Sequence, residues 1–305
     1  MQYDCVIVGG GFAGLQAAIQ LGRYRHKIAV VDAAEGRSAY CRNYDNLIGW
    51  PEGVSGMKLR AAGRLQAERL GVRFIAGTAV TARRRTECFV LELESGEEIT
   101  GARLLLATGV KDRIPGFREL IPCLGISVYI CPDCDGYEVA DQQVAVIGSG
   151  TAGANMALTL RHWTSRIIYI NHETADVPGE LLAQLAGQDI PYYEQPVAKI
   201  EVEDESQFRG VMLKDGTAIR CSKSFLAFGG NEVRSGLAEQ LGAGLTDNRH
   251  VITNPRTKLT TADYVWAAGD VTSHSEMVTI AMGDGSQAAI WIHKSLIGTF
   301  DGRNP

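Results

Sequence analysis

One local pattern occurs twice in this chain, and this repeat constrains the fold more than any other feature. Residues 3–8 form an apolar run suited to a buried strand, residues 9–14 (GGGFAG) form a Gly-rich turn, and residues 15–23 space their apolar side chains as a helix does. A second apolar run at residues 27–31 ends at Asp32. This order of strand, turn, helix and strand predicts a βαβ unit that binds a nucleotide at its turn.

The second copy begins at residue 143. A strand at residues 143–147, a turn at 148–153 (GSGTAG), a helix at 154–162 and a strand at 166–170 follow the same order. Each copy then leads into a β-meander with a polar turn. The predicted fold class is α/β, with two Rossmann-like three-layer ββα domains, the second inserted into the first.

The end of the chain is expected to return to the first domain. A strand at residues 264–268 ends in Gly269-Asp270, and a helix follows at residues 286–295. Both elements would complete the layers around the first sheet. The predicted domains are residues 1–112 together with 243–305, and residues 113–242.

Composition and charge exclude several classes of protein. The 305 residues are 45% hydrophobic and carry a net charge of -5 with no long basic run, which argues against nucleic acid as a partner. The longest apolar stretches are too short to span a bilayer, so we expect no membrane association. The N-terminus enters a strand without a charged leader, and we therefore expect a cytoplasmic protein. Seven cysteines, five of them scattered, do not form a secreted disulfide framework.

The first Gly-rich turn is expected to hold the pyrophosphate of a dinucleotide. Glycines allow the tight turn, the approach of backbone N–H groups to the phosphates, and close packing of helix on strand. The N-terminus of the following helix adds a favourable potential for phosphate. Asp32 is placed to accept hydrogen bonds from a ribose. The residues expected to bind here are Gly9, Gly11, Phe12, Ala13, Gly14 and Asp32.

The second turn has the pattern of a nucleotide site but lacks a clamp for NADPH. Asn171 stands where the acid of the first copy stands, and His172 and Glu173 follow it. A 2'-phosphate requires Arg or Lys there, so we expect poor use of NADPH unless a distant loop supplies the charge. An adenosine without that phosphate is not forbidden, and a second FAD is one alternative. The residues of this pocket are Gly148, Gly150, Thr151, Ala152, Gly153, Asn171 and His172.

Cys131 and Cys134 form a C-x-x-C pair that Asp135 follows directly. Such a pair closes to a disulfide or opens to two thiols, and Pro132 restrains the backbone between them. Asp135 is placed to exchange a proton with a thiol or a departing thiolate. A metal site would need a second C-x-x-C or a paired histidine, so we expect none. Set between two nucleotide turns, the pair predicts electron transfer between a bound redox cofactor and a disulfide.

Taken in order, these motifs resemble those of the low-molecular-weight thioredoxin reductase family over nearly the whole chain. The resemblance implies a homodimer of two-domain subunits with FAD in the discontinuous domain. It also implies a thioredoxin-like protein as the disulfide partner. The motifs that carry it are residues 9–14, 46–49, 51–53, 107–109, 131–136, 148–153 and 267–270.

The resemblance implies a role for each matching residue. Cys134 would face the flavin, Cys131 would attack the partner's disulfide, and Asp135 would be the acid. Asp270 would hold the ribityl chain of FAD, and Asn46 would lie near the flavin ring. The further residues expected at the FAD are Asn46, Ala107, Thr108, Gly109, Gly269, Asp270, Met277 and Val278.

Three segments depart from the family pattern. Residues 171–173 (NHE) replace His-Arg-Arg, residues 276–278 (EMV) replace Arg-Gln-Ala, and Pro132-Asp133 stands inside the C-x-x-C pair where Ala-Thr is common. The departures resemble relatives that do not use pyridine nucleotides, in which ferredoxin or a second flavin supplies the electrons. They are also similar to dithiol oxidases that pass electrons to oxygen.

The leading hypothesis is a flavoprotein that passes electrons through FAD and the Cys131–Cys134 pair to a protein disulfide, with ferredoxin or a second flavin as donor. An ordinary NADPH-dependent thioredoxin reductase is the second hypothesis. An oxygen-dependent oxidase of small-molecule dithiols is the third, and a flavin-bound redox sensor without turnover is the fourth.

Overall fold

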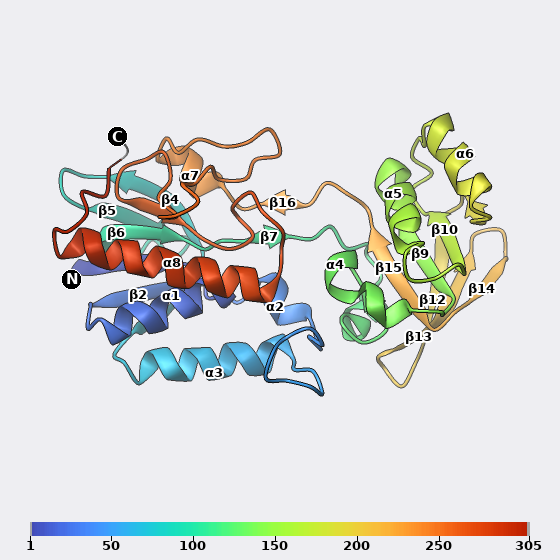
Figure 1. Cartoon of the computed structure of the whole chain (residues 1–305), viewed down its shortest axis with the longest axis horizontal. Helices are drawn as coiled ribbons and strands as arrows, with labels where there is room; N and C mark the ends of the chain where they lie inside the picture. Colours follow the sequence, from blue (N-terminus) through green and yellow to red (C-terminus); the bar gives the residue numbers. More distant parts are fainter. Residues whose placement is uncertain (1, 304–305) are drawn as a thin grey trace. The chain divides into compact units, whose positions relative to one another are not determined.

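The computed structural model describes residues 2–303 of the chain. The chain divides into two compact units (Figure 1). The chain returns to the first unit at Glu232, earlier than the expected boundary at residue 242. The reason is that α7 (Gly236–Gln240) buries Leu237 and Ala238 in the core of the first unit. The first unit comprises Met1–Ala39, Gly56–Lys111 and Glu232–Pro305, and the second comprises Tyr40–Ser55 and Asp112–Asn231.

The first unit is built on a seven-stranded sheet with the order β3-β2-β1-β6-β5-β4, in which β17 also pairs with β6. β1, β2, β6 and β17 run parallel, and β4, β5 and β6 form the antiparallel meander. The central strands are nearly continuous apolar runs, as expected of parallel strands covered on both faces. The strands are β1 (Gln2–Val8), β2 (Ile28–Asp32), β3 (Arg73–Ala76), β4 (Ala79–Arg84), β5 (Phe89–Leu93), β6 (Glu98–Leu106) and β17 (Val265–Ala267).

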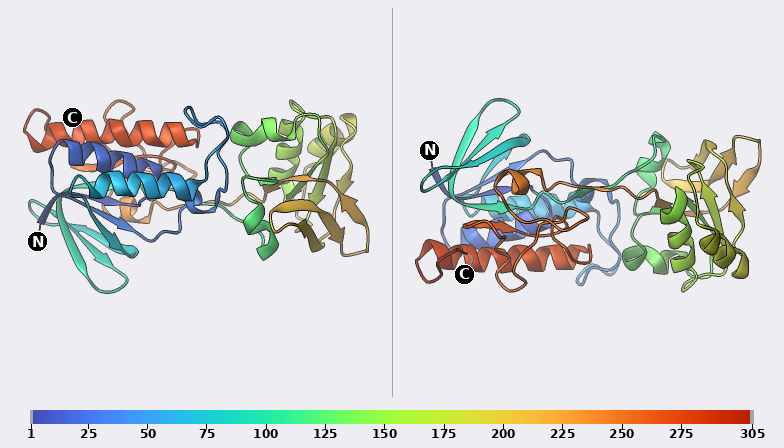
Figure 2. Two further views of the ribbon diagram at one scale, coloured as in Figure 1. Left: turned by 90° about the horizontal axis from the view of Figure 1, so that it is seen from below. Right: turned by 90° about the horizontal axis from the view of Figure 1, so that it is seen from above.

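Helices α1 (Phe12–Arg23), α3 (Gly56–Glu68) and α8 (Val278–Leu296) lie side by side against this sheet (Figures 1 and 2). A Cβ at Gly285 of α8 would lie 2.1 Å from Ala13 O, so the two helices meet backbone to backbone. Both α1 and α8 begin earlier than the predicted residues 15 and 286, because their first turns contain glycine or β-branched residues that weaken the helical signal. Two short elements complete the unit: α2 (Arg37–Tyr40), and the ladder of β7 (Val110–Lys111) with β16 (Glu232–Val233).

The second unit repeats the plan with a five-stranded parallel sheet of order β11-β10-β9-β15-β8. One face of the sheet packs on α5 and α6, and the other packs on the antiparallel meander β12-β13-β14 (Figure 2). The parallel strands are β8 (Val128–Tyr129), β9 (Val144–Gly148), β10 (Ile167–Asn171), β11 (Tyr192–Tyr193) and β15 (Lys223–Ala227). The remaining elements are α4 (Pro132–Asp135), α5 (Gly150–Leu160), α6 (Gly179–Gly187), β12 (Val197–Glu203), β13 (Gln207–Leu213), β14 (Ala218–Arg220) and the 3-10 turns Arg118–Cys123 and Gly136–Val139.

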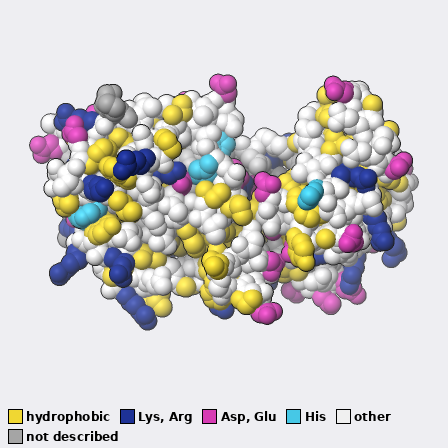
Figure 3. Space-filling view, in the orientation of Figure 1, with side chains coloured by type: hydrophobic (Ala, Val, Ile, Leu, Met, Phe, Trp, Pro, Cys, Tyr) yellow, Lys and Arg dark blue, Asp and Glu magenta, His cyan; other side chains and the backbone are white. Residues whose placement is uncertain are grey.

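From the sequence we expected no membrane association and no nucleic-acid partner. In the part of the chain that the structure describes, no helix has the length and hydropathy to cross a membrane. On the face drawn in Figure 3, the Lys and Arg side chains of the described residues lie in separate groups rather than in one continuous patch.

Candidate functional site

The first Gly-rich turn is tightly packed at both ends and open at its centre. Gly9 has φ +108°, and a Cβ there would lie 2.2 Å from Ala107 O. A Cβ at Gly14 would lie 1.9 Å from Gly9 O, so only glycine lets α1 pack this closely on the turn. Around Gly11 nothing lies within 4 Å of a Cβ position, and this N-cap of α1 has no side-chain hydrogen bond. The open helix N-terminus, where Phe12 and Ala13 begin α1, fits a pyrophosphate.

Asp32 ends β2 beside this turn. Its Oδ1 accepts a hydrogen bond from Gly10 N at 3.1 Å, and its Oδ2 pairs with Arg60 Nη2 at 2.7 Å. Arg60 comes from α3 and also donates to Ser38 Oγ at 3.0 Å. The Asp32 side chain remains 18% exposed, so it can also accept a hydrogen bond from a ribose hydroxyl. The sequence did not identify Arg60, because nothing in α3 marks which of its arginines faces the sheet edge.

Three expected residues follow β6 directly. Ala107 N donates to Val8 O at 2.8 Å, and Thr108 Oγ1 donates to Arg234 O at 2.6 Å. Gly109 has φ +69°, a left-handed conformation that favours glycine. These residues form the exit from the sheet beside the first turn, and their contacts with FAD stay a prediction.

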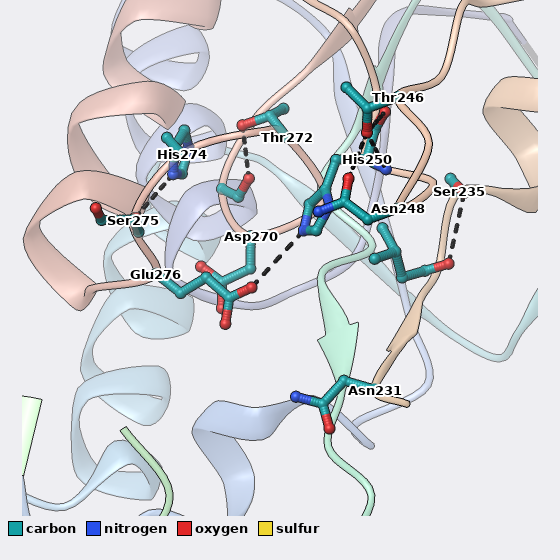
Figure 4. A network of polar contacts seen from close by, with 12 residues as sticks. Asn231, Ser235, Thr246, Asn248, His250, Asp270, Thr272, His274, Ser275 and Glu276 are labelled. Carbon is teal, nitrogen blue, oxygen red and sulfur yellow. Dashed lines mark hydrogen bonds and ion pairs between the residues drawn. The ribbon is translucent and has the colours of Figure 1, made fainter. Parts of the chain in front are cut away.

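Asp270 lies in an ionic network that the sequence did not reveal. Arg37 Nη1 contacts Asp270 Oδ2 at 3.0 Å and Glu276 Oε2 at 2.5 Å. On its other side Glu276 Oε1 lies 3.7 Å from His250 Nε2 (Figure 4). Glu276 stands where the family pattern has arginine. Its negative charge is balanced by Arg37, which comes from α2. Met277 is the N-cap of α8 and has no side-chain hydrogen bond there.

The second Gly-rich turn is closed by its own chain. Gly150 N donates to Asn171 Oδ1 at 3.0 Å, and a Cβ at Gly150 would lie 3.0 Å from Asp176 O. Asn171 has no exposed surface, and its Nδ2 donates to Ala175 O at 2.7 Å and Tyr192 Oη at 3.0 Å. The segment after β10 thus folds back over the turn, and Asn171 cannot reach a ribose in this conformation.

The flanking glycines of this turn have the packing roles predicted for them. A Cβ at Gly148 would lie 2.4 Å from Ala227 O, and one at Gly153 would lie 2.2 Å from the Tyr169 ring. Thr151 is exposed and Ala152 is half-buried at the start of α5. The turn therefore has the shape of a nucleotide site while its central N–H is already bonded.

The side chains after Asn171 also bond within the protein. His172 Nδ1 accepts a hydrogen bond from Val197 N at 2.9 Å, and burial lowers the pKa of His172, which keeps the ring neutral. A distant arginine is present, since Arg113 Nη2 lies 2.5 Å from Glu173 Oε1. Glu173 neutralises that arginine, so the basic clamp that a 2'-phosphate needs is not formed by these residues.

The C-x-x-C pair forms one turn of helix, α4, with Cys131 as its N-cap. The Cys131 Sγ accepts a hydrogen bond from Cys134 N at 3.2 Å. A hydrogen bond from the Cys134 thiol, together with that from its N–H, holds the pKa of Cys131 below its ordinary value, although burial and the charges of Asp133 and Asp135 oppose this. Cys131 therefore ionises more readily than an ordinary cysteine and supplies the nucleophilic thiolate near neutral pH.

Asp135 is surrounded by other charged groups of the second unit. Burial raises the pKa of Asp135 to about 7, and the nearby carboxylates of Glu138 and Asp45 act in the same direction. Lys223 opposes them with a positive charge, and its Nζ donates to Tyr129 Oη at 2.7 Å. A carboxyl group with this pKa can hold or release a proton near neutral pH, which suits an acid beside a thiol pair.

The contacts described above test neither the predicted place of Asn46 nor the expectation that the chain has no metal site. Asn46 belongs to the second unit, so its place beside the flavin stays a prediction. Among residues 2–303 there is no group of three or more His, Cys, Asp or Glu side chains that could hold a metal ion. The sequence missed Arg37, Arg60, Lys223 and Tyr129, which come from separate elements and share no motif.

The chain is similar to known proteins over nearly its whole length. The model of the pyridine nucleotide-disulphide oxidoreductase family matches residues 3–285. The chain is 28% identical over 313 residues to thioredoxin reductase tcpT of Claviceps purpurea, covering 98% of this chain and 96% of the relative. It is 26% identical to the thioredoxin reductase of Aquifex aeolicus, covering 97% and 94%. The crystal structure of HlmI matches with a TM-score of 0.86 at 28% identity, covering 97% of this chain and 93% of that one.

Proposed function

Because this chain belongs to the pyridine nucleotide-disulphide oxidoreductase family, we propose that it passes electrons through FAD and the Cys131–Cys134 pair to a protein disulfide such as that of thioredoxin, and that it uses NADPH poorly. Family membership makes it a flavin-dependent disulfide oxidoreductase of the thioredoxin reductase kind. The proposal concerns its two partners, the electron donor and the electron acceptor. We further propose ferredoxin or a second flavin as the donor, and a cytoplasmic homodimer as the working form.

The observation that carries the proposal is the closed second turn. In the first copy the central glycine faces open space, whereas in the second copy Asp176 O and Ala175 Cβ lie over Gly150. A dinucleotide entering there would have to displace the hydrogen bond between Gly150 and Asn171 and would approach an acidic segment. The same closure also argues against a second FAD at this turn, which leaves ferredoxin as the donor with more support.

FAD, when bound at the first turn, would supply the electron pair that reduces the Cys131–Cys134 disulfide. The Cys131 thiolate then attacks a disulfide sulfur of the partner, which forms a mixed disulfide and releases one partner thiolate. Cys134 next attacks Cys131 Sγ, closes the intramolecular disulfide and releases the second partner thiolate. Two electrons thus leave the dithiol and two sulfurs of the partner are reduced.

Asp135 manages the protons of this exchange. With a pKa of about 7, the carboxyl group carries a proton in about half of the molecules at neutral pH. It can therefore protonate a departing thiolate and later recover a proton when Cys134 ionises. Lys223 limits how far the pKa of Asp135 rises, since its positive charge favours the carboxylate, and its Nζ donates a hydrogen bond to Tyr129 Oη.

The test is an anaerobic titration of the holoprotein with NADPH, followed by flavin absorbance. We expect little bleaching by NADPH, full bleaching by dithionite and by reduced ferredoxin, and then reduction of thioredoxin by the reduced protein. Turnover with NADPH on the order of 10 per second would contradict the proposal and restore the ordinary reductase hypothesis. A ratio of FAD to chain near two would instead support a second flavin as the donor.

Variants separate the dithiol step from the flavin step. Cys131→Ser and Cys134→Ser should each stop thioredoxin reduction while dithionite still bleaches the flavin. Cys88→Ser is the matched control, because Cys88 lies in the first unit, between β4 and β5, and belongs to no C-x-x-C pair. If the Cys131→Ser protein still reduced thioredoxin, the assigned path of the electrons would be wrong. Peroxide formed on adding a dithiol in air would favour the oxidase hypothesis.

A further inference from the structure

Several residues of the loop that follows β17 contact one buried carboxylate. This loop contains Gly269 and Asp270. Asp284 lies on α8 with 7% of its side chain exposed. Its Oδ2 accepts a hydrogen bond from Gly269 N at 3.2 Å and from His274 Nε2 at 2.6 Å. Thr272 Oγ1 lies 3.4 Å from the same oxygen. Three positions of one short loop therefore converge on a single atom of the helix behind it.

The second oxygen of Asp284 is also bonded. Lys258 Nζ lies 2.6 Å from Asp284 Oδ1, with only 14% of the lysine side chain exposed. Lys258 lies in a turn, where its φ is +59°. Its backbone carbonyl accepts a hydrogen bond from Ala267 N of β17. The lysine is therefore supplied by a turn held on the same sheet, and the carboxylate has a cation on each side.

The hydrogen bonds of His274 identify its protonated form. Its Nδ1 lies 2.8 Å from Ser275 O (Figure 4). Its Nε2 lies 2.6 Å from the Asp284 carboxylate. A carbonyl and a carboxylate both only accept, so both ring nitrogens must carry a proton for both contacts to be hydrogen bonds. When the ring is neutral, one of the two contacts loses its hydrogen.

We propose that Asp284, His274 and Lys258 are positioning residues that hold the loop from Gly269 to Glu276 in the shape that binds FAD, so that the protein holds FAD less tightly when His274 loses its proton. The loop carries Asp270 at one end and leads into α8 at the other. Its outer side is fixed separately, since Arg37 contacts both Asp270 and Glu276. The inner cluster supports the loop through a hydrogen bond that depends on the protonation of His274.

The charges around His274 give the direction of the effect. The hydrogen bond to Asp284 raises the pKa of His274, while burial and the charge of Lys258 oppose this rise. Burial alone would raise the pKa of Asp284, but the hydrogen bonds from His274 and Lys258 hold it below its ordinary value. The other charged groups of the loop are Asp270 and Glu276, which Arg37 and His250 face. A raised histidine pKa means that the support is complete at low pH and is lost as pH rises through that pKa.

The inference requires FAD at the first turn, as family membership implies, and it does not depend on the electron donor. Its test is accordingly separate from the NADPH titration. A holoprotein that NADPH reduces rapidly would overturn the proposed donor and leave this inference unaffected. A holoprotein whose FAD retention ignores His274 would overturn this inference and leave the donor unaffected.

The experiment measures the dissociation constant of FAD by the fluorescence of released flavin, from about pH 6 to about pH 9. We expect the wild-type protein to hold FAD about tenfold more weakly at the high end, the loss expected for one charge-assisted hydrogen bond. His274→Gln should be as weak at low pH as the wild type is at high pH, with a flat profile. Lys258→Met and Asp284→Asn should weaken FAD binding at every pH.

A matched control lies on the same helix. His293 also stands on α8, but its Nδ1 bonds His26 Nε2 at 2.8 Å rather than the loop, so His293→Gln should keep the wild-type pH profile. A His274→Gln protein that follows the wild-type profile would overturn the inference, as would a wild-type protein whose FAD affinity does not change with pH. If Asp284→Asn fails to fold, His274→Gln still decides, because that side chain is one-fifth exposed and its loss leaves no large cavity.

Discussion

The two Gly-rich turns share a sequence pattern and differ in what covers them. In the first, Gly11 faces open space, and Asp32 ends the next strand with part of its side chain exposed. In the second, Gly150 lies under Asp176, and Asn171 is fully buried with both of its amide atoms hydrogen-bonded. The residue at the end of the second strand bonds the turn in both copies. It remains accessible to a ligand only in the first.

This difference teaches that a Gly-rich turn is necessary for a dinucleotide site but does not guarantee one. The packing role of the glycines is the same in both copies, because helix, strand and turn approach equally closely. The binding role depends on the segment after the second strand, which no turn motif includes. The second unit has retained the scaffold and carries the dithiol pair, whereas the first has retained the opening.

The largest effect is expected from making the second turn resemble the first. Asn171→Asp would place a carboxylate opposite Ala175 O and remove the donor that Asn171 Nδ2 provides. We expect the free energy of unfolding to fall by about 2–4 kcal/mol, the cost of burying a poorly satisfied carboxylate. Urea denaturation measures this loss. An Asn171→Asp protein as stable as the wild type would show that the bonds from Asn171 Nδ2 do not hold the turn closed.

Filling the opening of the first turn is expected to have the next largest effect. A methyl group at Gly11 meets no atom within 4 Å, so Gly11→Ala should fold normally but crowd the pyrophosphate of FAD. We expect FAD affinity to fall about tenfold, since overpacking by one methyl costs about 1–3 kcal/mol. Gly179→Ala, another open position but at the start of α6, is the control. Equal FAD affinity in both proteins would mean that Gly11 does not line the site.

The reciprocal exchange at the first turn should be milder. Asp32→Asn keeps an oxygen for Gly10 N and loses the charge that pairs with Arg60. Stability should fall by about 1.5–3 kcal/mol, because the pair is mostly buried and Arg60 would lose its charged partner. FAD affinity should fall about tenfold, as expected when a charged acceptor becomes neutral. Calorimetric titration of the apoprotein with FAD measures the change, and an unchanged affinity would remove Asp32 from the site.

The dithiol region adds a pH dependence of its own, separate from that proposed for His274 in the first unit. The pKa of Asp135 rises from 3.8 to about 7 on folding, so the folded protein binds a proton that the unfolded chain releases between these values. The stability of the protein should therefore fall as pH rises from about 4 to about 7. Asp135→Asn should flatten this slope in thermal unfolding followed over the same range. An unchanged slope would place the pKa of Asp135 near its ordinary value.

The smallest effect is expected at the exposed pair beside the second turn. Glu173→Gln removes the partner of Arg113, an ion pair that is more than one-third exposed on both sides. Stability should change by less than about 1 kcal/mol. The variant nevertheless sharpens the comparison, because it releases a cation next to the second turn. We expect only a slight gain in reduction by NADPH, and a large gain would mean that Glu173 rather than the closed turn excludes the nucleotide.

The sequence by itself determined the α/β class and the two copies of the βαβ unit, and it revealed the C-x-x-C pair at Cys131 and Cys134. These follow from local features, since the spacing of glycines and apolar runs fixes the neighbouring backbone. Periodicity also placed the last strand and helix, and β17 indeed pairs with β6 of the first sheet. The starts of α1, α5 and α8 were placed too late, because glycine and β-branched residues in their first turns carry little helical signal.

Only the tertiary structure decided which copy of the turn is open and which charges meet. Arg60 reaches Asp32 across 28 residues, Arg37 reaches Asp270 across 233, and Asp284 reaches His274 across 10. Such pairs depend on how helices settle on the sheet edge, and no local pattern records that choice. The closure of the second turn depends in part on such a contact, since Tyr192 of β11 meets Asn171 where β10 and β11 pair.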